Sequence, residues 1–181
     1  MDKKYVQIEL TNDKVINLEL YPEIAPISVE NFLSLVEKHY YDNVIFHRIM
    51  DGFMIQTGGY YIEDMTLKEK EELKPIKGEF SSNGVKNDLS HELGVISMAR
   101  TSVKDSATSQ FFLCAADCKF LDGEYAAFGK TIDKASNDVI LEVSKVETGR
   151  LSPMFTDFPV EMIGIKTIRE LTLEEVEKLD K

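Results

Sequence analysis

Two short segments near the start of the chain alternate apolar and polar residues, and this alternation limits the possible folds more than any other feature. YVQIEL (5–10) and VINLELY (15–21) flank the polar sequence TNDK. Successive side chains of a β-strand point to opposite faces, so each segment is predicted to be a strand with one buried face. A polar connection of this size joins hairpin strands. We therefore expect an antiparallel hairpin in a sheet that covers a core.

Short apolar runs continue along the chain, separated by Gly, Ser and Asp. NVIFHRIM and FMIQTGG flank the turn residues Asp51 and Gly52, and GVISMAR, SQFFLCAA and AAFGKTI follow later. Many short strands with regular turn signals are typical of an all-β barrel or sandwich. The pattern alone leaves these two architectures open.

Two segments have helical periodicity. ISVENFLSLVEKHYY predicts an amphipathic helix with Ser28 as its N-cap, and DKASNDVILEVSKVETG predicts a second helix with Gly149 as its C-cap. We expect these helices to close the ends of a barrel. The charged segment 61–77 is predicted to be a surface insertion with one or two helical turns, and the tail to form a last strand and a short charged helix near 172–180.

Length and charge restrict the classes of protein. With 181 residues, of which 43% are hydrophobic, residues 1–181 are predicted to form a single domain. The formal net charge of −11 argues against binding to nucleic acid or to an anionic membrane. We found no apolar run of signal-peptide or membrane-spanning length and expect a cytoplasmic protein. Cys114 and Cys118 have no second cysteine pair, so we expect free thiols and no metal site.

Five segments, taken together and in order, resemble the cyclophilin family of peptidyl-prolyl cis-trans isomerases. They are APISVENFLSLV, FHRIMDGFMIQTGG, GVISMAR, SQFFLCAA and FLDGEYAAFGKTI. KGEFSSNG and the later SMAR are similar to the small bacterial members. The resemblance implies a mainly β fold, a closed eight-stranded antiparallel barrel capped by two α-helices, with a substrate groove on its outer surface. It also implies rotation about X-Pro bonds without a cofactor, in proline-containing peptides and in unfolded or folding proteins.

The resemblance implies a set of site residues. The catalytic position falls on Arg48, and the implied substrate-binding positions are Phe53, Met54, Gln56, Ala99, Arg100, Gln110, Phe112, Phe120, Leu121 and Tyr125. Three residues depart from the common pattern of the family: Asp51 replaces a proline, Phe120 a tryptophan and Tyr125 a histidine. Phe120 lacks the indole N–H that donates to cyclosporin in tryptophan-bearing members, so we expect weak cyclosporin binding. We also expect a monomer.

The chemistry of such a site also follows from the residues themselves. Rotation about an X-Pro bond crosses a barrier of about 18–20 kcal/mol but breaks no covalent bond, so it needs neither a nucleophile nor a cofactor. In the twisted transition state the proline nitrogen pyramidalises and becomes a better acceptor. Arg48 is always protonated and offers several N–H groups. The apolar residues Phe53, Met54, Phe112 and Leu121 are expected to hold the pyrrolidine ring.

Strand register provides an internal test of this site. With a two-residue loop Arg48 faces Ile55 across the hairpin, whereas a three-residue loop that includes Phe53 places it opposite Gln56. Only the second register brings both polar residues together, and we predict it.

Alternation also sorts the residues of SQFFLCAA between two faces. Gln110, Phe112 and Cys114 are predicted to lie on the groove face, and Phe111 and Leu113 in the core.

Several alternatives stay open from the sequence. A lone arginine in a strand is commonly a solvated or ion-paired surface residue, and apolar strand residues are commonly core. His47 is predicted to be structural, since alternation turns it away from Arg48 and the reaction needs no base. Two other functions are a proline-peptide binding module without useful turnover and a lipocalin-type barrel with a small molecule inside. Large inward-facing residues argue against an empty interior.

Overall fold

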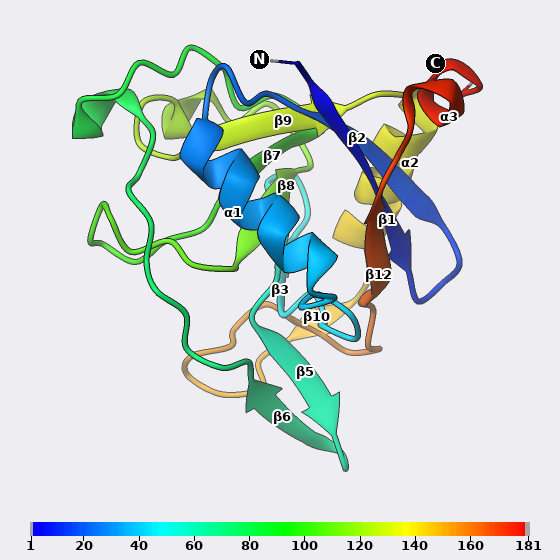
Figure 1. Ribbon diagram of the computed structural model, residues 1–181. Helices are drawn as coiled ribbons and strands as arrows, with labels where there is room; N and C mark the ends of the chain where they lie inside the picture. Colours follow the sequence, from blue (N-terminus) through cyan, green and yellow to red (C-terminus); the bar gives the residue numbers. More distant parts are fainter. Residues whose placement is uncertain (1, 180–181) are drawn as a thin grey trace.

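The computed structural model describes residues 2–179, and its main element is one eight-stranded antiparallel sheet (Figure 1). The strand order is β12-β1-β2-β9-β7-β8-β4-β3. These strands are β1 (Lys4–Leu10), β2 (Val15–Leu20), β3 (Arg48–Met50), β4 (Met54–Thr57), β7 (Val95–Met98), β8 (Phe111–Cys114), β9 (Ala127–Thr131) and β12 (Ile165–Glu170). Two smaller sheets pair β5 (Tyr60–Glu63) with β6 (Thr66–Glu69), and β10 (Thr148–Gly149) with β11 (Phe158–Pro159).

The sheet curls but does not close, so the prediction of a closed barrel is wrong. A closed barrel needs a partner on both sides of every strand. Here β12 and β3 are the two ends of the sheet and do not pair with each other. The free edge of the short β3 is taken by a loop, because the Ile49 N–H donates to the Asp157 carbonyl at 3.0 Å. The fold is therefore an open half-barrel.

The first hairpin is confirmed. β1 and β2 pair antiparallel around residues 11–14, with Val6 opposite Leu18 and Ile8 opposite Ile16. These four side chains are fully buried, as the alternation predicts.

The two longer helices are α1 (Pro26–Glu37) and α2 (Lys134–Ser144). In Figure 1, α1 lies in front of the sheet and α2 behind it, and Phe32 and Ile140 from the two helices belong to one buried core. The α2 N-terminus is capped by Asp133, which accepts from the Ser136 N–H. The helix ends at Ser144, so the prediction of Gly149 as its C-cap is wrong.

The predicted N-cap Ser28 is also wrong, because α1 begins two residues earlier, at Pro26. Proline fits the first helical position, where its missing N–H is no loss. The end of the helix is instead held by Glu79, which is 2% exposed. Its carboxylate accepts from the N–H groups of Ile27 at 3.2 Å and Ser28 at 2.6 Å, and from the Ser28 hydroxyl at 2.8 Å. A carboxylate at this end also matches the helix dipole.

The charged segment 61–77 contains a β-hairpin, so the expected helical turns are wrong. β5 and β6 project from the body of the molecule (Figure 1). Asp64 and Met65, at the turn, both have positive φ, at 52° and 60°. Two consecutive residues in this conformation make a turn that matches the twist of paired strands.

The tail forms β12 and then α3 (Leu173–Glu177), with a capping box between Thr172 and Glu175. Residues 1, 180 and 181, which the predicted domain and terminal helix partly include, lie outside the described residues. Within residues 2–179, no helix has the length and apolar character needed to cross a membrane.

Candidate active site

Nine of the eleven predicted site residues line one hollow on the outer face of the sheet, with a volume of about 160 Å³. They are Arg48, Phe53, Met54, Gln56, Ala99, Arg100, Phe112, Leu121 and Tyr125. The apolar floor belongs to a small cluster separate from the main core, in which Met54, Phe112 and Leu121 are buried. Phe32, Phe111 and Phe128 are fully buried in the main core, and this argues against a lipocalin-type ligand inside the half-barrel.

The three-residue hairpin loop is confirmed. Arg48 pairs with Gln56 and Met50 with Met54, which leaves residues 51–53 as the loop. The predicted faces of β8 are confirmed as well, since Phe112 and Cys114 belong to the outer cluster and Phe111 and Leu113 to the main core.

The exposed side chain of Arg48 lies at the rim of the hollow. Its Nη1 donates to Gln56 Oε1 at a long 3.4 Å, and its guanidinium carbon lies 5.9 Å from the centre of the Phe53 ring. These contacts use few of the five N–H donors of an arginine. The geometry therefore leaves Arg48 able to donate hydrogen bonds to a ligand in the hollow.

Two of the predicted residues do not line the hollow. Gln110 contacts a residue that lines the hollow: its Oε1 accepts a hydrogen bond from Gln56 Nε2 at 2.9 Å. This hydrogen bond orients the Gln56 side-chain amide, whose oxygen accepts from Arg48. Phe120 stands at the outer edge, 72% exposed, with its ring 5.5 Å from that of Phe53.

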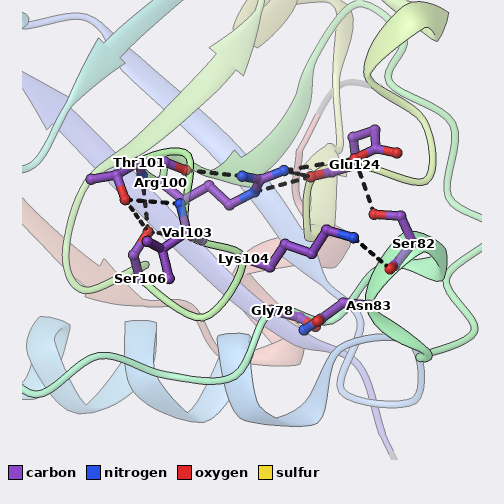
Figure 2. A network of polar contacts seen from close by, with 9 residues as sticks. All are labelled: Gly78, Ser82, Asn83, Arg100, Thr101, Val103, Lys104, Ser106 and Glu124. Atoms are coloured by element: carbon purple, nitrogen blue, oxygen red, sulfur yellow. Dashed lines mark hydrogen bonds and ion pairs between the residues drawn. The ribbon is translucent and has the colours of Figure 1, made fainter.

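Arg100 uses its donors to hold the wall of the hollow (Figure 2). Its Nε and Nη2 donate to the Glu124 carbonyl at 3.1 and 2.7 Å, and its Nη1 donates to the Thr101 carbonyl at 2.9 Å. The guanidinium also lies against the rings of Phe80 and Tyr125, 4.9 and 4.7 Å from their centres. Arg100 therefore ties the loop after β7 to the loop that carries Tyr125.

A polar group near Phe112, in which His91 and Ser97 are buried and Asp122 is exposed, was not predicted. His91 lies between Asp122, 2.9 Å from its Nδ1, and the Ser97 hydroxyl, 2.9 Å from its Nε2. The three residue types match those of a hydrolase triad, but Ser97 is 0% exposed and no substrate can reach it. The His91 ring is stacked near that of Phe112, with centroids 6.0 Å apart. We assign His91, Ser97 and Asp122 the role of supporting the Phe112 ring. No periodic pattern around His91 in the sequence indicates this role.

His47 is buried and does not line this hollow, in keeping with its predicted structural role. Burial, with a smaller effect from the charge of Arg48, lowers the pKa of His47 to about 4. The imidazole is therefore neutral at pH 7.

The thiols are not nucleophiles in this setting. Cys114 and Cys118 are free and buried, and burial raises the pKa of Cys114 far above its usual value. Within residues 2–179, no group of three or more His, Cys, Asp or Glu side chains is placed to hold a metal ion.

The structure is therefore an open half-barrel with an apolar hollow on its outer face and an arginine at the rim of that hollow. The family model described as cyclophilin type peptidyl-prolyl cis-trans isomerase/CLD matches residues 5–170. The chain belongs to this family of isomerases.

Relatives and solved structures agree with the family. The chain is 41% identical to a peptidyl-prolyl cis-trans isomerase of Acinetobacter baylyi, over 88% of this chain and 81% of that protein. It is 38% identical to peptidyl-prolyl cis-trans isomerase B of Escherichia coli, over 87% and 94%. A cyclophilin type isomerase of Cryptosporidium parvum matches with a TM-score of 0.75 and 25% identity, over 94% of this chain and 99% of that one. The same parasite protein was also solved in the presence of the dipeptide Ala-Pro.

Proposed function

We propose that the hollow beside Arg48 is where this isomerase binds and turns X-Pro bonds. The observation that carries the proposal is the pairing of Arg48 with Gln56 across the hairpin, at the rim of an apolar hollow of about 160 Å³. The parasite relative that was solved with Ala-Pro supports a proline-containing ligand.

The proline ring occupies the apolar floor made by Phe53, Met54, Phe112 and Leu121. Its removal from water supplies binding free energy and anchors one side of the rotating bond. The carbonyl that precedes the proline is left free to swing.

Arg48 supplies the catalytic interaction. A guanidinium N–H donates to the proline nitrogen, which accepts well only when the amide is twisted, so the contact is stronger in the transition state than in either planar ground state. The fork geometry lets a second N–H hold the prolyl carbonyl. Gln56, oriented by Gln110, contributes a polar group to the substrate backbone beside it.

The test is a protease-coupled isomerisation assay on short X-Pro peptides. Arg48→Ala should lower kcat/KM at least about tenfold, a loss of about 1.4 kcal/mol of transition-state stabilisation. Arg150→Ala removes another exposed arginine that does not line the hollow and should leave kcat/KM unchanged. Full turnover by Arg48→Ala would remove Arg48 from the mechanism, and peptide binding without turnover by the unmodified chain would favour a binding module.

The substrates that we propose are proline-containing peptides and folding proteins. Assistance to protein folding, a monomeric state, a cytoplasmic location and weak cyclosporin binding stay predictions from the sequence.

A further inference from the structure

Ser82 joins two loops beside the hollow (Figure 2). It is an exposed residue of the 3₁₀-helix η1 (Ser81–Asn83). Its hydroxyl donates to Glu124 Oε2 at 3.0 Å, its N–H donates to the Gly123 carbonyl at 2.9 Å, and its own carbonyl accepts from Lys104 Nζ at 2.8 Å. All the polar groups of this one residue therefore bind residues between 22 and 42 positions away along the chain.

Glu124 is held at both of its ends. Arg100 binds its carbonyl through Nε and Nη2, and the Ser82 hydroxyl binds its carboxylate. Arg100 Nη2 also lies 3.8 Å from the carboxylate oxygen that accepts from Ser82. Tyr125, the next residue, lines the hollow, with its ring centre 4.7 Å from the guanidinium carbon of Arg100 and 5.8 Å from the ring of Phe112. The orientation of Glu124 therefore sets the place of Tyr125 in the wall.

The segment that carries Ser82 is anchored to the core. Phe80 is 1% exposed, and its ring centre lies 4.9 Å from the guanidinium carbon of Arg100. Glu79 binds the start of α1, because its carboxylate accepts from the Ser28 N–H at 2.6 Å. With its neighbours fixed in this way, the Ser82 hydroxyl has a defined position from which it orients the exposed Glu124 side chain.

The hydroxyl is the one polar group of Ser82 that depends on the type of residue. The N–H and the carbonyl belong to the backbone, so alanine at this position keeps the bonds to Gly123 and Lys104. A hydrogen bond to an ionised carboxylate is stronger than one between neutral groups. Replacement of the hydroxyl therefore removes a single contact, the one that reaches Tyr125 through Glu124.

We propose that Ser82 is a positioning residue for the isomerase reaction, which acts through Glu124 to hold Tyr125 against the bound proline. The proposal rests on the proposed function, because it assigns Ser82 an effect on the substrate in that hollow. Arg48 contacts Gln56 instead, so its contact with the transition state does not pass through Ser82. A displaced Tyr125 weakens the binding of substrate and transition state alike, which raises KM and leaves kcat unchanged.

The experiment measures kcat and KM in the protease-coupled assay over a range of X-Pro peptide concentrations. Ser82→Ala should raise KM about threefold and leave kcat within about twofold, as expected for the loss of one exposed hydrogen bond that supports substrate binding. Ser102→Ala is the matched control, because Ser102 is an exposed serine of the neighbouring loop that does not line the hollow. It should leave both constants unchanged.

A double-mutant cycle tests whether Ser82 acts through Glu124. Glu124→Ala removes the carboxylate but keeps the carbonyl that Arg100 binds, so in this background Ser82→Ala should no longer raise KM. A merely structural serine would lower the midpoint of thermal unfolding without changing KM.

Two results overturn the positioning role alone. One is an unchanged KM in Ser82→Ala, and the other is an equal rise of KM with and without the Glu124 carboxylate. No turnover of the peptide by the unmodified chain overturns the proposed function.

Discussion

Acidification from pH 7 to pH 5 should destabilise the fold through His47. The pKa of His47 is lowered to about 4, first by burial and then by the charge of Arg48, whereas an unfolded histidine titrates near 6.5. Between these values the unfolded chain binds a proton that the folded chain refuses, so the free energy of unfolding rises with pH in this window. The stabilisation is therefore present above pH 6.5 and is lost as the pH falls toward 4.

The magnitude follows from the two pKa values. At pH 5 an unfolded histidine is almost fully protonated and the folded His47 is mostly neutral, so His47 alone should reduce the free energy of unfolding by about 2 kcal/mol relative to pH 7. Burial lowers the pKa of His91 too, which adds a loss in the same direction.

The assay is urea unfolding at pH 7, 6 and 5 of the unmodified chain and of His47→Phe. Phenylalanine keeps an aromatic ring against Tyr60 but cannot bind a proton. The loss between pH 7 and pH 5 should be about 2 kcal/mol smaller in His47→Phe. His39→Asn, which removes an exposed histidine at a left-handed position with φ of 57°, should keep the full loss. Equal losses in the unmodified chain and in His47→Phe would refute the reasoning.

Four further outcomes are expected. Arg48→Lys should lower kcat/KM several-fold or more in the coupled assay, because an ammonium does not reproduce the fork, and unchanged kinetics would contradict this. Between pH 6.5 and pH 8.5, kcat/KM should vary less than about twofold, since arginine stays protonated. EDTA should not change kcat/KM, because the proposed mechanism uses no metal. A bell-shaped pH profile would argue for a general base. Arg100→Lys should lower the free energy of unfolding by about 1.5–3 kcal/mol and raise KM, because the hydrogen bonds to the Glu124 and Thr101 carbonyls are lost. Thermal unfolding and peptide kinetics measure the two effects. Unchanged stability and KM would show that the wall of the hollow does not depend on these hydrogen bonds. Phe120→Trp should tighten cyclosporin inhibition several-fold while kcat/KM for peptides changes much less, and nanomolar inhibition of the unmodified chain would contradict the assignment of Phe120.

The strands and the hairpin register were predictable because their signals are local. The alternation in β1 and β2, and the choice between two loop lengths that placed Arg48 opposite Gln56, each depend on fewer than about a dozen neighbouring residues. Whether the sheet closes into a barrel is not set by neighbouring residues. The edge of β3 is taken by the carbonyl of Asp157, a loop residue more than 100 positions away along the chain, and β3 does not pair with β12.

The contents of the site divide in the same way. Phe112 was placed on the groove face by alternation within one strand, whereas the support beneath it comes from His91 and Asp122, which no spacing rule connects. The N-terminus of α1 is a second example. Ser28 suggested a cap from within the helix, whereas the carboxylate that accepts from its first N–H groups belongs to Glu79, far along the chain. Sequence patterns reveal the faces of an element but not the partners that fold onto it.

The position of β1 between β2 and β12 has a consequence for the order of folding. Val6 pairs with Leu18 on one side and with Glu170 on the other. During synthesis the second edge of β1 must wait for the last strand, and closing so long a loop makes the step slow. A nascent chain that stops before Ile165 presents an unpaired strand edge, the kind of surface through which chains aggregate. One edge of β1 therefore stays open through most of translation, until β12 has been synthesised.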